Sequence, residues 1–100
     1  MLQVTLFLDQ DDRVDDKPMH EHILHHLLHH HIAGATVFAG LGGFGSHRHL
    51  HYPRRLGASD EVPLMIVFID EEERVRSVLP HLRELLPNGL MTVGTVETVK

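Results

Sequence analysis

Residues 63–69 read PLMIVFI, a run in which every residue is apolar. In a β-strand, alternate side chains point to opposite faces of the sheet. A strand that is apolar at every position therefore has to be covered on both faces. The polar residues before Pro63 and the acidic residues from Asp70 onward limit the run at each end. This stretch predicts a strand buried on both sides, and the remaining elements can be placed around it.

Five further elements are predicted from the spacing of their apolar residues. They are a strand at residues 2–8, a helix that opens at Lys17 and Pro18 and runs to about His31 before Gly34, a strand from Ala35 to Ala39, a helix from about residue 70 to 86 that contains Pro80, and a strand at residues 90–99. The predicted order is β-α-β-β-α-β.

That order, with right-handed crossovers, predicts an α+β fold of the ferredoxin-like βαββαβ type: a four-stranded antiparallel sheet with two helices on one face. The other face of the sheet is then bare. Because residues 63–69 are apolar on both sides, burying that face at about 25 cal/mol per Å² favours subunits packed sheet against sheet. We expect a single domain over residues 1–100 that forms a homo-oligomer.

Composition excludes several classes of protein. The chain has no cysteine, so any metal ion must be held by His, Asp or Glu. Its formal net charge is -5, and it lacks the basic patch and interleaved aromatic residues typical of nucleic-acid binding. No apolar run approaches the roughly 20 residues of a membrane span, and the first residues are typical of a strand rather than of a signal peptide. These features predict a cytoplasmic protein that neither binds nucleic acid nor inserts into a membrane.

Seven of the eleven histidines lie within residues 20–31, which read HEHILHHLLHHH. In a helix they form a polar stripe opposite the leucines. Pairs four residues apart on such a stripe can hold one metal ion between them, although tight binding needs a third ligand from elsewhere. The alternative is a solvated face, and His81 is expected to be only a helix-surface residue. The histidine stripe consists of His22, His25, His26, His29 and His30.

A second group of histidines lies in the polar segment that precedes residue 62. His47, His49 and His51 alternate, so they point the same way in an extended chain. A polar segment of this length is a candidate functional loop. Together with the histidine stripe, these residues indicate one possible function, a metal-binding protein of nickel, copper, zinc or cobalt homeostasis or sensing. A pH sensor that uses protonation of the same stripe is a further alternative.

The segment HIAGATVFAGLGGFG, residues 31–45, resembles the PII signalling superfamily, in which a Gly-x-Thr-Val strand and a Gly-Phe-Gly sequence precede a long T-loop. The chain is still more similar to a PII-like family, domain of unknown function 190, whose features recur in order along it. The matching positions are Lys17 and Pro18, Ala33 to Val37, Gly43 to Gly45, Leu79 and Pro80, and Gly89 to Val93.

The resemblance implies a homotrimer that binds a small effector, such as an adenine nucleotide, in clefts between subunits. It also implies a T-loop, here about residues 46–61, that controls a protein target such as a membrane transporter. Glycines on the cleft wall let backbone N–H groups approach an anionic ligand closely. Carried over position by position, the candidate ligand-binding residues are Gly42, Gly43, Phe44, Gly45, Ser46, Asn88 and Gly89.

The sequence departs from the PII pattern around the nucleotide phosphates. PII proteins place a loop rich in glycine and lysine there, together with arginines near the C-terminus. Here these places hold residues 87–89, which read PNG, and a final strand whose only basic residue is Lys100. A less charged ligand, such as a nucleoside monophosphate or a cyclic nucleotide, fits this pattern, with Arg48, Arg54 or Arg55 supplying charge. No Ser-His-Asp set, P-loop or HExxH pattern occurs, so an enzyme is not expected.

Overall fold

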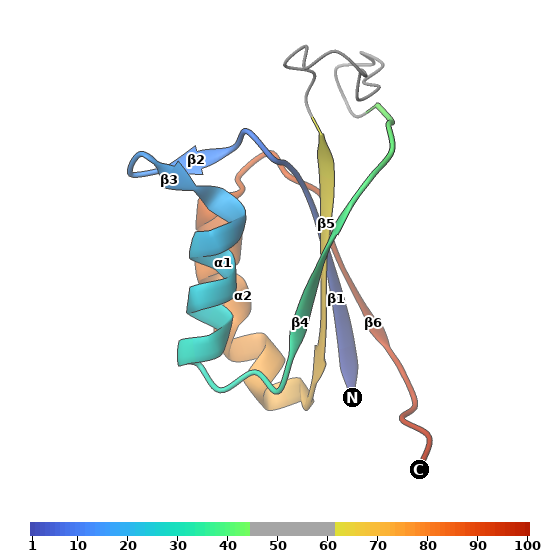
Figure 1. The fold of residues 1–100 in the computed structure, drawn as a ribbon. Coiled ribbons are helices and arrows are strands. Elements are labelled where there is room, and N and C mark those ends of the chain that lie inside the picture. The colour runs from blue at the N-terminus through green and yellow to red at the C-terminus, as the bar shows by residue number, and fades with distance from the viewer. Residues whose placement is uncertain (45–61) are drawn as a thin grey trace.

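The computed structural model of the chain describes residues 1–44 and 62–100, in which two helices cover one face of a four-stranded antiparallel sheet (Figure 1). The strand order is β4-β5-β1-β6, which confirms the predicted ferredoxin-like arrangement. A short hairpin, β2 and β3, lies between β1 and α1. The elements are β1 (Leu2–Asp9), β2 (Arg13–Val14), β3 (Lys17–Pro18), α1 (Met19–His29), β4 (Ala35–Ala39), β5 (Pro63–Asp70), α2 (Glu72–Leu85) and β6 (Met91–Thr95).

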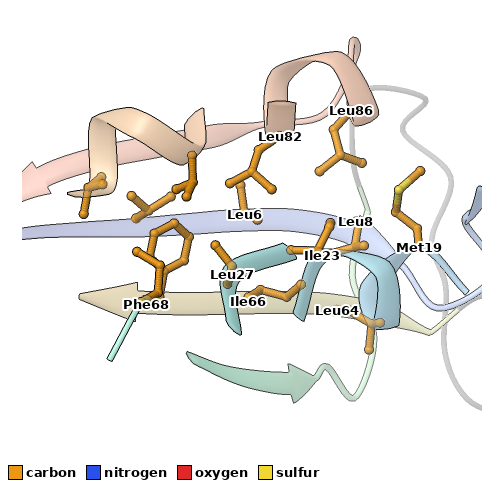
Figure 2. Close-up of a cluster of buried hydrophobic side chains, with 14 of the residues drawn as sticks. Leu6, Leu8, Met19, Ile23, Leu27, Leu64, Ile66, Phe68, Leu82 and Leu86 are labelled. Atoms are coloured by element: carbon orange, nitrogen blue, oxygen red, sulfur yellow. The ribbon is translucent and has the colours of Figure 1, made fainter. Parts of the chain in front are cut away.

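The hydrophobic core lies between the sheet and the two helices. The pairing of β1 with β5 places Leu6 opposite Ile66 and Val4 opposite Phe68, so these side chains share the face that the helices cover. Figure 2 shows the helix side chains that meet them. The labelled core residues are Leu6, Leu8, Met19, Ile23, Leu27, Leu64, Ile66, Phe68, Leu82 and Leu86, all buried.

The opposite face of the sheet, which we call the open face, carries an apolar row and is uncovered by the described residues of the single chain. Phe38, Met65 and Phe7 form a row across β4, β5 and β1, because Met65 pairs with both of the other residues. Phe38 is 49% exposed and Phe7 is 42% exposed, while Ile69 lies on the same face farther along β5. The sequence predicted that this face needs a cover, and within the described residues the chain supplies none.

The end of α1 differs from the prediction. The helix stops at His29 instead of about His31, because His31 adopts a left-handed conformation with a φ of 64°. The amide of Ile32 then donates to the carbonyl of Leu27 at 3.1 Å, the hydrogen bond that closes a Schellman motif. Burial of Ile32 accompanies this turn. The apolar position after the helix therefore ends it, ahead of Gly34.

Other boundaries also differ from the prediction. Lys17 and Pro18, predicted to open the first helix, form β3, and α1 begins at Met19. β6 ends at Thr95, so the last strand is shorter than the predicted residues 90–99. Asp70 ends β5 instead of starting α2, and α2 continues through Pro80. Among the described residues, neither helix is both long and apolar enough to cross a bilayer.

Asp70 is a buried carboxylate, 3% exposed, that joins three parts of the chain. It accepts hydrogen bonds from the amides of Ala33 and Glu71 at 2.8 and 2.7 Å, and from Arg74 Nη1 at 3.1 Å. Burial by itself raises the pKa of Asp70, but these hydrogen bonds and the Arg74 charge outweigh it and hold the pKa below its usual value. The carboxylate therefore fixes the turn before β4 to the start of α2.

Replacing Asp70 by Asn is expected to lower the free energy of unfolding by about 2 kcal/mol, because an amide cannot accept from both backbone donors and carries no charge for Arg74. Urea unfolding at neutral pH measures the change. Glu72→Gln is the matched control: Glu72 pairs with Arg76 at 3.6 Å on the exposed surface, so its loss is expected to cost less than about 0.5 kcal/mol. Equal effects of the two substitutions would contradict the role assigned to Asp70.

Candidate functional site

The first candidate segment follows β4. The amide of Gly40 donates to the carbonyl of Pro63 at 2.7 Å, and a Cβ atom at Gly40 would lie 2.9 Å from Pro63 Cγ. Gly43 has a φ of 157°, a conformation that L side chains rarely adopt, but a Cβ there would meet no atom within 4 Å among the described residues. A side chain at position 43 would therefore point into open space among the described residues, while Gly43 itself is half-buried and takes part in an isolated β-bridge.

The predicted ligand-binding residues in this segment are only partly described. Gly42 and Gly43 lie just beyond β4, and Phe44 follows them with 66% of its surface exposed. Gly45 and Ser46 lie outside the described residues, as do His47, His49 and His51 and the predicted T-loop at residues 46–61.

The second candidate segment, Asn88 and Gly89, connects α2 to β6. The amide of Gly89 donates to the carbonyl of Leu86 at 3.1 Å, which makes a tight turn. Arg83, in the last turn of α2, donates from Nη2 to the carbonyl of Gly89 at 2.6 Å and also to the carbonyl of Leu86. This places a guanidinium group directly beside the predicted ligand-binding residues.

Arg83 was not predicted from the sequence, because basic residues were expected only in the loop and near the C-terminus. Its position in the last turn of a helix that ends in Pro-Asn-Gly could have indicated this contact, since a cation there can bind the free carbonyls of the helix end.

The two segments lie at the same end of the sheet but at opposite edges. Ala39 pairs with Leu64, and Leu64 pairs with Leu8, while the amide of Phe7 donates to the carbonyl of Leu90. In the order β4-β5-β1-β6, three strand spacings separate the edges, about 14 Å at 4.7–4.9 Å each. One chain therefore does not bring its own two candidate segments together around a small ligand.

The helices bring together a histidine cluster, defined here as His22 and His26 of α1, His30 directly after α1, and His81 of α2. Nε2 of His22 lies 3.3 Å from Nε2 of His81. The ring of His26 lies between two others, with centroid distances of 4.3 Å to His81 and 4.2 Å to His30. The expectation that His81 is only a helix-surface residue is therefore wrong. The two histidines that it contacts lie 55 and 59 positions away in the sequence, so their spacing carried no signal of contact.

The predicted histidine stripe divides into two parts. His25 and His29 contact each other, with centroids 6.5 Å apart, and neither ring contacts the α2 histidine. Within residues 1–44 and 62–100, no three His, Asp or Glu side chains are already arranged to hold a metal ion. Two of the pairs four residues apart that the sequence predicted, His25 with His29 and His26 with His30, are thus in contact. His81 of α2 is the further histidine that contacts the stripe.

The imidazole of His26 is held neutral at physiological pH. Burial is the largest cause, and the neighbouring His30, His81 and His22 add to it, so that the pKa of His26 falls from 6.5 to about 4. A hydrogen bond with the backbone of Val78 opposes the shift without reversing it. His26 itself therefore does not change charge near pH 6 to 7, where the predicted pH sensor would act.

A hollow of about 550 Å³ opens beside the histidine cluster, between the start of α1 and the β2–β3 hairpin. It is lined by Lys17, Glu21, His22 and His25. Of the histidine cluster, His22 is the member that faces this hollow.

Comparison with known protein families gives one match over almost the whole chain. The model of the family DUF190, described as uncharacterized ACR, matches residues 1–98. A UPF0166 protein of Aquifex aeolicus (strain VF5) is 27% identical over 96 residues, which are 96% of this chain and 90% of that protein. A UPF0166 protein of Methanocaldococcus jannaschii is 32% identical over 92 residues, covering 92% of this chain and 84% of that protein.

A solved structure shows the same fold. CPII, a nitrogen regulatory PII-like protein from Thiomonas intermedia K12, was solved bound to ADP, AMP and bicarbonate. It superposes with a TM-score of 0.69 at 20% sequence identity, covering 93% of this chain and 82% of CPII. At this identity the similarity establishes a PII-like fold, and the ligands are those of CPII.

The lowered pKa of His26 predicts how acid affects the metal-free protein. The unfolded chain binds a proton at this residue below about pH 6.5, whereas the folded chain binds it only below about pH 4. The free energy of unfolding is therefore expected to fall as the pH drops through this window, and His26→Gln should reduce the dependence. Urea unfolding in EDTA measures it, with His29→Gln as the control that keeps the wild-type slope. An unchanged slope in His26→Gln would contradict the assignment.

Proposed function

The chain belongs to the DUF190 family, as the sequence resemblance predicted, and from this membership and its fold we propose that it is a PII-like regulatory protein. In this proposal a homotrimer binds an adenine nucleotide in clefts between subunits and controls a protein partner, such as a membrane transporter, through residues 46–61. The observation that carries the proposal is the split site: both candidate segments lie at one end of the sheet, at its two opposite edges.

A second subunit can complete the ligand site. The two candidate segments of one chain lie at opposite edges of the sheet, about 14 Å apart. In the proposed trimer, a ligand in contact with Gly43 of one subunit would therefore contact the Asn88–Gly89 segment of a neighbour. A site shared between subunits also gives the ligand a means to change their arrangement, which is what a regulatory protein requires.

The open face gives a reason for the subunits to associate. Phe7, Phe38 and Met65 form an apolar row that crosses three strands, and two of them are more than 40% exposed in the isolated chain. Each 100 Å² of apolar surface buried there contributes about 2.5 kcal/mol. Sheet-to-sheet packing would bury this row and bring the edges of neighbouring sheets close to one another.

The charges of the described site favour a ligand with few phosphates. Arg83 is the cation beside Gly89, and the backbone at Gly43 can supply N–H groups to a phosphate or ribose. CPII, which shares the fold, was solved with ADP, AMP and bicarbonate. AMP and ADP are therefore the first ligands to test, ahead of ATP.

Calorimetric titration of the full chain with AMP, ADP and ATP is expected to show saturable binding of AMP or ADP. Arg83→Gln should weaken it by about 10- to 100-fold, because a hydrogen bond to a charged group contributes about 1.5–3 kcal/mol. Arg76→Gln is the matched control and should bind as the wild type, since Arg76 pairs with Glu72 elsewhere on α2. Gly43→Ala should also weaken binding, because the φ of 157° at Gly43 is one that alanine rarely adopts. Gly34→Ala is the control and should bind as the wild type, because a Cβ at Gly34 also meets open space but without such a φ. Absence of binding by all three nucleotides would contradict the proposed effector.

Sedimentation of the wild-type chain is expected to give a trimer, and Phe38→Glu should shift it toward the monomer by placing a charge in the apolar row. Leu28→Glu is the control on the helical side, where Leu28 is 68% exposed on α1, and should leave the trimer intact. A monomeric wild type that still binds nucleotide would contradict the shared site, whereas a trimer insensitive to Phe38→Glu would place the interface elsewhere.

A further inference from the structure

The structure assigns a second ligand site, distinct from the proposed nucleotide cleft. We propose that the histidine cluster binds a divalent transition metal ion of zinc type between α1 and α2, with Nε2 of His22, His26 and His81 as ligands and water in the fourth position. The sequence indicated metal binding by pairs within one helix. The structure replaces those pairs by a site that joins two helices and depends on His81.

The spacing of two donor atoms fits tetrahedral coordination. Nε2 of His22 and Nε2 of His81 are 3.3 Å apart. Two ligands at about 2.0–2.1 Å from one zinc ion, with a tetrahedral angle between them, lie about 3.3–3.4 Å from each other. An ion can therefore replace the shared hydrogen bond between these rings without moving the helices apart.

The third ring has a buried nitrogen without a partner. Nε2 of His26 has no hydrogen-bond partner among the described residues. A buried polar atom left unpaired costs free energy, and a metal ion bound to this nitrogen would offset that cost.

The chemistry of the cluster also suits a borderline-soft transition metal ion. The residues in contact with His81 are histidines from α1, and no hydrogen bond or ion pair joins the cluster to a carboxylate within the described residues. Neutral imidazoles without an acidic partner are typical ligands of zinc, nickel and copper, and poor ligands of calcium or magnesium.

Within the described residues, no three such side chains are placed to hold a metal ion, so the proposed site forms only when the histidine rings turn toward one another. His26 and His81 are already in ring contact at 4.3 Å, and His22 and His26 lie one turn apart on α1. His22 also faces the hollow between the start of α1 and the β2–β3 hairpin.

Cobalt(II) titration of the full, tag-free, metal-stripped chain tests the site, because tetrahedral Co(II) has strong visible absorption and zinc displaces it. We expect saturation at one ion per chain, and a loss of affinity of at least about 10-fold, or 1.4 kcal/mol, in His81→Gln. The double variant His25→Gln/His29→Gln is the matched control: it removes an i, i+4 pair from the same helix but should bind as the wild type. A His47→Ala/His49→Ala/His51→Ala variant should also retain the tetrahedral spectrum.

Thermal unfolding provides a second readout. Zinc should raise the melting temperature of the wild type, because it binds only the folded arrangement of α1 and α2, and this rise should be absent in His81→Gln. Equal cobalt affinity in wild type and His81→Gln would overturn the proposal, as would loss of the spectrum in the loop variant. The proposal does not rest on the nucleotide site, and nucleotide binding by His81→Gln is expected to be unchanged.

Discussion

The register between β1 and β5 is the constraint on which the rest of the structure depends. It aligns Leu6 with Ile66 and Phe7 with Met65, so that adjacent residues of each strand serve two different faces. A shift by one residue would exchange the faces and expose the core. With this register, the inner face forms the core with both helices, and the outer face presents an apolar row that the single chain leaves uncovered. The stability of the chain and its proposed association thus depend on the same pair of strands.

The sheet also determines where the predicted ligand-binding residues lie. Gly43 follows one edge strand and Gly89 precedes the other, and two central strands separate them. In the proposed trimer, a neighbouring subunit would bring the second segment next to a ligand held at the first. The proposed regulatory function follows from this separation, because a ligand held between subunits can alter how they are arranged. Arg83 adds a positive charge at one of the two edges, where the sequence showed only a Pro-Asn-Gly turn.

The packing of the two helices determines which histidines contact one another. α1 and α2 lie on the same face of the sheet (Figure 1), and their contact sets His81 against His22 and His26. Part of a surface stripe thereby becomes a cluster around the half-buried His26, whose Nε2 atom is buried. Such an arrangement costs free energy in the absence of a cation, because several imidazoles share a small volume without a carboxylate partner. The proposed metal site would offset that cost by using the same lone pairs.

The sequence by itself determined the order of the elements, the fold class and the family. These follow from local information: the all-apolar run at residues 63–69, helical spacing around Pro80, and the glycine-rich segment after β4 each depend on neighbouring residues. It also indicated an uncovered apolar face, since β5 is apolar on both sides. The end of α1 was less predictable, because burial of Ile32, a tertiary contact, decides where the helix stops.

Only the tertiary structure decided which candidate residues meet. Gly43 and Asn88 share an end of the sheet but not an edge, a consequence of strand order that no spacing in the sequence encodes. His81 contacts His22 because two helices pack on one face of the sheet. Asp70 likewise accepts a hydrogen bond from the amide of Ala33, 37 positions away, because the fold brings these two segments together. Sequence patterns report contacts within a turn or a strand pair. Contacts between elements depend on how the whole core packs, and this packing determines which residues of the candidate sites lie close together.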